Sequence, residues 1–173
     1  MFYLFLADGF EETEALAPLD MMRRAKIEVK TVGVTGEFVT GSHGVTVKAD
    51  LKPEEISFNN IDGVVLPGGM PGTINLGKSE TVTKAAVYCA ENGKITAAIC
   101  AAPSVLGNLG ILKGKKATCF PGFEKELEGA TYTAAPVEID GNVITGKGAG
   151  CAILFGKAIV EKAVSAEAAN KIC

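Results

Sequence analysis

Apolar runs alternate with segments of helical period along most of this 173-residue chain. Runs rich in Val, Ile and Leu predict strands with both faces buried, at residues 1–7, 27–34, 61–67 and 95–99. Apolar residues at helical spacing predict helices, at residues 11–25, 79–92, 102–109, 150–163 and 165–172. This alternation predicts an α/β fold, in which a mostly parallel sheet is sandwiched by helices.

A different pattern occupies residues 38–48, where apolar and polar residues alternate around Gly41-Ser42-His43-Gly44. Alternation around such a turn predicts a small antiparallel hairpin, which we expect to be appended to the main sheet. Further short strands are predicted, at residues 116–119, 130–134, 137–139 and 143–145. We see no repeat or linker, and the length suits one compact core, so we expect a single domain over residues 1–173.

Composition and charge argue against several classes of partner. The formal net charge is −3 and the lysines and arginines are scattered, so the sequence has no cluster of positive charge that would bind nucleic acid or anionic lipid. The apolar start at residues 1–7 lacks a basic leader and a small-residue cleavage site, which argues against a signal peptide or a membrane span. The five cysteines form an odd set without a C-x-x-C pair, which fits a reducing compartment. We therefore expect a cytoplasmic protein without nucleic-acid or membrane partners.

One cysteine stands where a nucleophile is often found. Cys100 directly follows the predicted strand at residues 95–99, and the helix after it begins among small residues. A sharp strand-to-helix turn holds its residue in a sparsely allowed conformation and requires small neighbours, which Ala98, Ala101 and Ala102 are. The helix N-terminus would also stabilise a thiolate. The alternative, a small buried hydrophobic residue, stays open for Cys100 on local sequence alone.

The remaining cysteines are weaker candidates for a reactive thiol. Cys89 lies on a core face of its helix and Cys119 lies inside a short strand, so packing explains both. Cys151 opens a helix and is a weaker second candidate for a low pKa, whereas Cys173 is a terminal residue without an evident role.

A glycine-rich loop follows another buried strand at Leu66-Pro67-Gly68-Gly69. In parallel sheets such loops gather at the carboxyl edge, so this loop and Cys100 are expected to meet. Paired glycines let the backbone approach a ligand closely, and their N–H groups would face a developing oxyanion together with the N–H of Ala101. A plain turn is the alternative interpretation of the same residues.

A carboxylate is expected at the same edge, because residues 8–18 form another loop and helix start. Glu11 and Glu12 need be no more than partners of the helix dipole. Glu14 differs, because Pro18 cannot donate the helical hydrogen bond to its carbonyl, and the resulting kink would turn Glu14 inward. Only a protonated Glu14 would activate Cys100, since a charged carboxylate raises the pKa of a neighbouring thiol. The two groups would then titrate as a coupled pair.

Cofactor motifs are incomplete. The segment around Gly148 and Gly150 has Ile153 in the third glycine position of a dinucleotide fingerprint, and the sequence has no Walker loop. One histidine and dispersed cysteines give no zinc-ligand spacing. We therefore expect neither a metal nor any other cofactor.

Taken together, these segments resemble the ThiJ/PfpI superfamily, most closely its parkinsonism-linked DJ-one branch, over almost the whole chain. The resemblance rests on four motifs in the same order, each at a strand end: Glu11-Glu12-Thr13-Glu14 before a proline, Leu66-Pro67-Gly68-Gly69, residues 97–103, and Gly148-Ala149-Gly150.

The resemblance implies a flavodoxin-like (Rossmann-like) fold of the class I glutamine amidotransferase type, and usually a homodimer. Cys100 would be the nucleophile in the elbow and Glu14 its protonated hydrogen-bond partner. Gly69 and Ala101 would supply oxyanion donors, with Gly68 and Phe120 beside the substrate. Proteins of this kind are assigned glutathione-independent glyoxalase or deglycase activity on methylglyoxal and its adducts, redox sensing through cysteine oxidation, and chaperone activity.

This chain departs from the family pattern where histidines are expected. The protease branch has histidine after the cysteine, where this chain has Ala101, and the DJ-one branch often has histidine where this chain has Phe120. The sole histidine, His43, falls in the predicted hairpin, where an exposed turn residue is expected. Proteolysis is therefore not expected, because the leaving group would lack its usual proton donor.

Two functions from different classes remain. In the first, Cys100 of a cofactor-independent enzyme adds to a small α-oxoaldehyde such as methylglyoxal, or acts on its protein adducts, while Glu14 moves protons. In the second, a redox-sensing or chaperone-like dimer is oxidised at Cys100 to sulfinic acid without metabolic turnover. A flavin-binding module of the same fold is a third possibility, and it would be coloured when purified.

Overall fold

The computed structural model describes residues 1–172, and a six-stranded sheet lies at its centre. In spatial order the strands are β2 (Val29–Gly33), β1 (Phe2–Leu6), β5 (Gly63–Leu66), β6 (Ile95–Ile99), β10 (Val143–Gly146) and β9 (Val137–Asp140). All neighbouring pairs are parallel except β10 and β9. The mostly parallel sheet predicted from the apolar runs is therefore confirmed.

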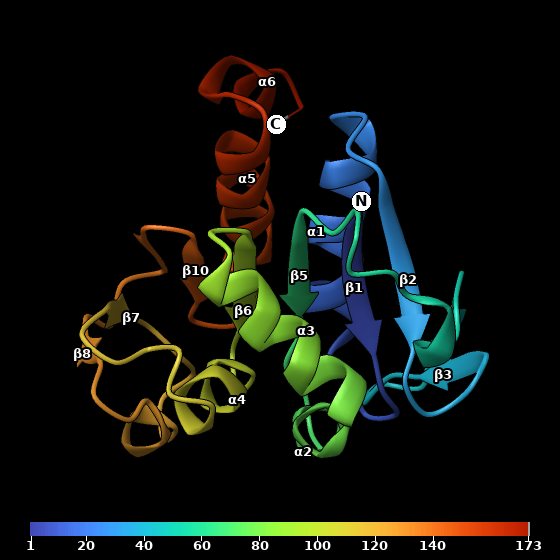
Figure 1. The fold of residues 1–173 in the computed structure, drawn as a ribbon, viewed down its shortest axis with the longest axis horizontal. Coiled ribbons are helices and arrows are strands. Elements are labelled where there is room, and N and C mark those ends of the chain that lie inside the picture. Colours follow the sequence, from blue (N-terminus) through green and yellow to red (C-terminus); the bar gives the residue numbers. More distant parts are fainter. Residues whose placement is uncertain (173) are drawn as a thin grey trace.

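Helices cover both faces of the sheet. Figure 1 shows α3 (Glu80–Glu91) in front of the sheet and α1 (Glu12–Arg24) behind it. α5 (Ala152–Ala163) shares a buried apolar cluster with α1, whereas α4 (Pro103–Asn108) shares a second cluster with α3. The short helices α2 (Gly72–Lys78) and α6 (Ala166–Lys171) complete the helical layers. This is the sandwiched α/β architecture expected from the sequence, although α2 was not predicted.

The hairpin forms where it was predicted but not as part of the main sheet. β3 (Phe38–Thr40) and β4 (Thr46–Lys48) pair with each other in an antiparallel sheet of two strands. β7 (Lys116–Ala117) and β8 (Thr131–Tyr132) make a second separate pair, which is parallel. The expectation that the hairpin joins the main sheet was therefore wrong. Single-turn helices also form in the loops: η1 (Pro53–Glu55), η2 (Glu124–Glu126) and η3 (Ala149–Cys151).

Close packing of α1 against α5 fixes how α1 lies on the sheet. A Cβ atom at Gly156 of α5 would lie 2.9 Å from the Pro18 Cα and 2.8 Å from the Met21 Sδ, so only glycine allows this approach. α1 runs through Pro18 as one helix, and its N-cap Glu11 accepts a hydrogen bond from the Glu14 N–H at 2.7 Å. The first turn of α1 is thereby held at the carboxyl edge of the sheet.

The loops that follow β1, β5 and β6 lie at one end of the molecule, at the carboxyl edge to which the β1 and β5 arrows point in Figure 1. The predicted site residues belong to these loops and to the helices that begin after them, except Phe120, which follows β7 (Lys116–Ala117). Among residues 1–172, no helix has the length and apolar character that crossing a membrane requires.

Candidate active site

The backbone of Cys100 adopts a strained conformation, and hydrogen bonds hold both its N–H and its carbonyl group. Its φ angle is +65°, in the left-handed region that residues with side chains rarely adopt. Its N–H donates to the Gly146 carbonyl at 2.9 Å, and its carbonyl accepts from the Phe120 N–H at 2.8 Å. The half-buried Cys100 side chain therefore sits on the sharp turn predicted between β6 and the helix behind it.

Glu14 reaches the same place from the first turn of α1. Its side chain is 1% exposed, and its Oε2 accepts a hydrogen bond from the Gly68 N–H at 3.0 Å. The Ala149 N–H and the Cys100 thiol are its other hydrogen-bonding neighbours. The predicted inward orientation of Glu14 is thus present, and the carboxyl group is held by the loops after β5 and β10.

Gly68 lies between the thiol and the carboxyl group. A Cβ atom there would lie 2.6 Å from the Cys100 Cβ and 2.6 Å from the Glu14 Oε2. Any larger residue would therefore push the two groups apart. Because the Gly68 N–H already donates to Glu14, it is not free for a substrate oxyanion. The expectation that both paired glycines present free donors was wrong for Gly68, which positions the carboxyl group instead.

Two other backbone N–H groups, those of Gly69 and Ala101, face the sulfur of Cys100. Gly69 has a φ of +89°, and a Cβ atom there would lie 2.4 Å from the Glu11 backbone nitrogen. The loop after β5 therefore requires glycine at this position in order to pack on the start of α1. These two donors lie where charge on the sulfur, or on an oxygen bonded beside it, would be stabilised.

The thiol and the carboxyl group perturb each other. Burial raises the pKa of Glu14 to about 7, although hydrogen bonds from Cys100 and the Gly68 N–H oppose this rise. Burial, followed by the charge of Glu14, raises the pKa of Cys100 to about 12, against the effect of the Ala101 and Gly69 N–H groups. The predicted stabilisation of a thiolate by the helix start is therefore outweighed while Glu14 is charged.

Together, the two pKa shifts mean that the Cys100–Glu14 pair holds a single proton when the pH is above the pKa of Glu14. With the charge on the carboxylate, the Gly68 and Ala149 N–H groups stabilise it. With the charge on the sulfur, the Gly69 and Ala101 N–H groups stabilise it, and the protonated Glu14 is itself a donor. A thiolate at Cys100 therefore requires the proton to sit on Glu14, whereas the raised thiol pKa of about 12 favours the form with the charge on the carboxylate.

Phe120 and His43 occupy different surroundings. The Phe120 side chain is 48% exposed, and a Cβ atom at Gly148 would lie 3.2 Å from its ring, so the ring packs over this glycine. The side chain of His43 is 72% exposed, and its Nδ1 lies 3.0 Å from the Glu12 Oε2. His43 is thus the exposed turn residue that the sequence predicted, and its partner is a glutamate rather than Cys100.

Glu12 has a role that sequence reasoning missed. It is 8% exposed, and its Oε1 accepts hydrogen bonds from the backbone N–H groups of His43 at 2.7 Å and Val45 at 3.3 Å. It therefore fastens the hairpin turn to the first turn of α1, beyond the dipole role expected for it. Glu11, Glu12 and His43 offer ligand atoms within 4.8 Å of one another, but both oxygens of Glu12 already accept hydrogen bonds. We assign no metal to this cluster.

The other described cysteines lie apart from this chemistry. Cys89 and Cys119 are buried, and burial raises their pKa values to about 12 and about 11, as expected of packing residues. Cys151 is half-buried at the N-cap of α5. Cys173 lies outside the described residues.

With this geometry in place, comparison with known proteins gives the family. Residues 2–162 match the DJ-1/PfpI family. The chain belongs to this family. It is 40% identical to Protein DJ-1 homolog B of Arabidopsis thaliana over 159 residues, which cover 91% of this chain and 36% of the plant protein. It is 33% identical over 144 residues to a protein of Pyrococcus abyssi named a deglycase, with 82% of this chain and 86% of that protein covered.

Solved structures of the family agree in fold. The structure of Toxoplasma gondii DJ-1 in an oxidised form superposes with a TM-score of 0.94 at 34% identity, and 99% of this chain and 94% of that chain are covered. The resemblance drawn from the four motifs is therefore confirmed, and so is the fold it implied. The chain spans well under half of the plant relative but nearly all of the archaeal one.

Proposed function

We propose that this protein is a cysteine-dependent, cofactor-independent enzyme of the glyoxalase or deglycase type. Its substrates would be small α-oxoaldehydes such as methylglyoxal, or their protein adducts. The observation that supports this most is the contact between Cys100 and the buried Glu14, which share one proton above the pKa of Glu14. The name of the Pyrococcus abyssi relative, deglycase, points to the same chemistry.

In the first step, the Cys100 thiolate attacks the aldehyde carbon of the substrate. A carbon–sulfur bond forms, the carbonyl π bond breaks, and the negative charge moves to the oxygen. The N–H groups of Gly69 and Ala101 stabilise that charge, and Glu14 then gives its proton to the oxygen to leave a hemithioacetal. Glu14 is suited to this step because its pKa of about 7 lets it both give and take a proton near neutrality.

In the second step, the Glu14 carboxylate removes the proton from the carbon bonded to sulfur, which gives an enediolate. That proton returns to the neighbouring carbon, while the hydroxyl proton of the hemithioacetal passes to the oxygen of that neighbouring carbon, so the carbonyl group now stands at the carbon bonded to sulfur. The product is a thioester of Cys100, which water hydrolyses to lactate and the free thiol. Overall, one methylglyoxal and one water give one lactate, so no oxidant or reductant is consumed. No side chain is assigned to activating that water, because Phe120 occupies the position where relatives often have histidine.

The test is lactate formation from methylglyoxal in the absence of glutathione. We expect turnover by the wild-type protein, none by Cys100→Ala and a large loss in Glu14→Gln. Cys151→Ala is the matched control, because it removes a half-buried thiol outside the Cys100–Glu14 contact and should leave turnover unchanged. Turnover that survives Cys100→Ala would rule out the mechanism.

A redox-sensing, chaperone-like dimer is the second candidate, favoured by the half-buried position of the same thiol and by the oxidised form of the Toxoplasma gondii relative. In this case mild peroxide would add two oxygens selectively to Cys100, giving sulfinic acid, while methylglyoxal turnover stays absent. Mass spectrometry of the Cys100 peptide together with the lactate assay separates the two candidates.

We further propose that the chain acts as a single domain, forms a homodimer and resides in the cytoplasm. Sedimentation of the purified protein tests the dimer, and a monomer at micromolar concentration would overturn it.

A further inference from the structure

A charged contact lies next to the first turn of α1, in the turn between β3 and β4. The His43 Nδ1 lies 3.0 Å from the Glu12 Oε2 and 3.9 Å from the Glu11 Oε1. These two carboxylates stand at the start of α1, and among the described residues they are the charged groups that face the imidazole ring. The proposed catalytic steps use none of these three side chains.

The contact continues to the Glu14 carboxyl group through Glu11. The Glu11 Oε2 accepts a hydrogen bond from the Glu14 N–H at 2.7 Å, and the Glu11 N–H donates to the Gly68 carbonyl at 2.9 Å. Glu11 therefore joins the two segments that hold the Glu14 carboxyl group. Burial is the main cause of the raised pKa of Glu14, and the negative charge of Glu11 raises it further. A positive charge next to Glu11 opposes that second effect.

The surroundings of the contact let its charges act on the site. The side chains of Glu11 and Glu12 are only 17% and 11% exposed, so water screens them less than it screens charges on an open surface. His43 itself is largely exposed, which keeps the effect modest. The hydrogen bond to Glu12 and the charge of Glu12 raise the pKa of His43 above its ordinary 6.5, so its positive charge persists closer to neutral pH.

The turn is held in place without the imidazole ring. The backbone N–H groups of His43 and Val45 donate to the Glu12 Oε1 at 2.7 Å and 3.3 Å. The Ser42 N–H donates to the Phe10 carbonyl at 2.7 Å. A different side chain at residue 43 keeps all three bonds, so it changes the charge of the turn without releasing its backbone.

We propose that His43 is a positioning residue whose positive charge, acting through Glu11 and Glu12, lowers the pH at which the Cys100–Glu14 pair loses its first proton. The side-chain partners of its ring among residues 1–172 are Glu12 and Ser42, so His43 influences the pair by charge rather than by contact. The inference goes beyond the proposed function, because it applies equally to a thiol that turns over methylglyoxal and to one that is only oxidised.

Two substitutions of opposite effect test the role of the charge. His43→Lys keeps a positive charge at every pH used, and His43→Gln removes it. The rate of Cys100 alkylation by iodoacetamide is measured against pH by mass spectrometry of the Cys100 peptide. At low salt, we expect the midpoint in His43→Gln to lie about 0.3–0.5 higher in pH than the midpoint in His43→Lys, with the wild-type protein between them.

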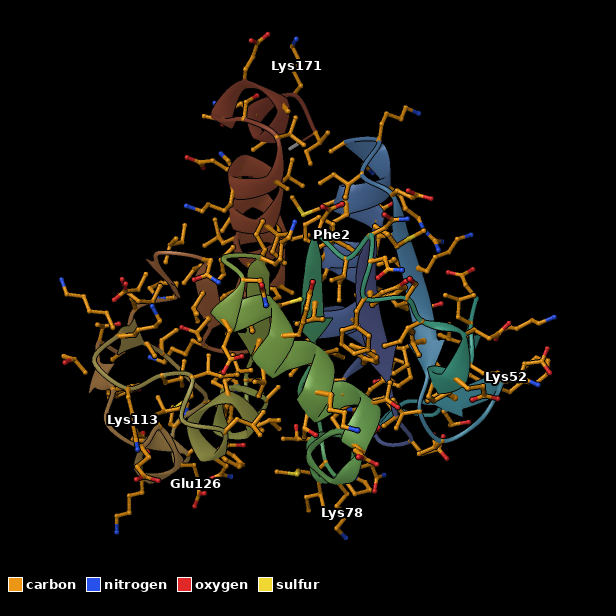
Figure 2. The ribbon with its side chains drawn as sticks, in the orientation of Figure 1. Phe2, Lys52, Lys78, Lys113, Glu126 and Lys171 are labelled. Atoms are coloured by element: carbon orange, nitrogen blue, oxygen red, sulfur yellow. The ribbon has the colours of Figure 1, made fainter. Side chains whose placement is uncertain are left out.

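Salt and a distant lysine provide the controls. The screening length is ~30 Å at about 0.01 M salt and ~3 Å at about 1 M, so the difference between the two variants should vanish at about 1 M. Lys171→Gln is the matched control, because Lys171 is 71% exposed and pairs with one glutamate, Glu167, at 2.7 Å. Figure 2 shows Lys171 at the end of the molecule opposite the carboxyl edge of the sheet. Its removal should leave the midpoint unchanged.

The order of the midpoints separates a charge effect from a structural one. A turn that merely loosens would move both His43 variants in the same direction, whereas a charge effect moves them apart. Equal or reversed midpoints in the two variants, a difference that persists at about 1 M salt, or an equal shift in Lys171→Gln would each overturn the proposal. If Glu14→Gln also has the wild-type midpoint, the shared proton itself is refuted. If Glu14→Gln differs while the two His43 variants coincide, only the role of His43 is refuted.

Discussion

Burial of Glu14 should make the stability of the protein depend on pH in a way that one substitution removes. The pKa of Glu14 rises from an ordinary 4.5 to about 7 in the folded protein. Between these values the folded state binds more protons than the unfolded state, so the free energy of unfolding falls as pH rises. Below about pH 4.5 this loss is absent, and above about pH 7 it is complete.

The magnitude follows from the size of that rise. Each pKa unit is worth about 1.4 kcal/mol, so the rise from 4.5 to about 7 corresponds to ~3 kcal/mol. Glu14→Gln keeps the shape and the acceptor for the Gly68 N–H, but it cannot ionise. The difference in the free energy of unfolding between the variant and the wild-type protein should therefore grow by ~3 kcal/mol in favour of the variant as the pH rises from about 4 to about 8.

Urea unfolding of both proteins at several pH values measures this difference. Far-UV circular dichroism is the suitable signal, because the chain has no tryptophan. Groups that do not contact Glu14 titrate equally in both proteins and cancel in the comparison, and below pH 8 the Cys100 thiol, with its raised pKa, stays protonated in both. A stability difference that stays constant within about 0.5 kcal/mol across this range would refute the reasoning about Glu14.

Two further predictions concern packing around the site. Gly68→Ala, whose Cβ would lie 2.6 Å from the Glu14 Oε2, should cost about 1–3 kcal/mol of stability by urea unfolding and abolish lactate formation, whereas Gly77→Ala should do neither. If the Gly68→Ala variant is active and as stable as the wild-type protein, the loop after β5 can move to accommodate the added methyl group. Glu12→Ala should cost about 1–3 kcal/mol and raise amide hydrogen exchange in the turn at residues 41–46, because the His43 and Val45 N–H groups lose their part-buried acceptor. Unchanged exchange there would mean that Glu12 does not hold the turn.

Much of this site could be predicted from the sequence because its signals are local. The strand, the small residues after it and Cys100 are contiguous, so a sharp turn at Cys100 followed from adjacent residues alone. The turn is a short-range consequence of backbone geometry. The inward orientation of Glu14 was also predicted, from a kink at Pro18, but α1 runs through Pro18 as one helix and the Gly68 N–H, 54 residues away, holds the carboxyl group.

The parts that were missed depend on contacts between distant segments. Glu12 binds a turn that lies 31 residues further along the chain, and no local pattern reports this pairing. Similarly, the Gly68 N–H is taken by Glu14 across 54 residues, which removed one donor from the expected oxyanion site. The helix α2 was missed for a different reason, since Gly72 and Gly77 give it a low intrinsic helix propensity.

The central claim is that Cys100 and Glu14 share one proton near neutral pH, and the rate of Cys100 alkylation against pH tests it most directly. Iodoacetamide labelling is followed by mass spectrometry of the Cys100 peptide, with Cys151 as the internal reference. In the wild-type protein the rate should rise with a midpoint near the Glu14 pKa of about 7, because loss of the first proton creates the fraction of the pair that carries its charge on the sulfur. In Glu14→Gln the midpoint should move upward, since burial alone raises the thiol pKa. The same midpoint in both proteins, near the ordinary thiol value of about 8.5, would contradict the account.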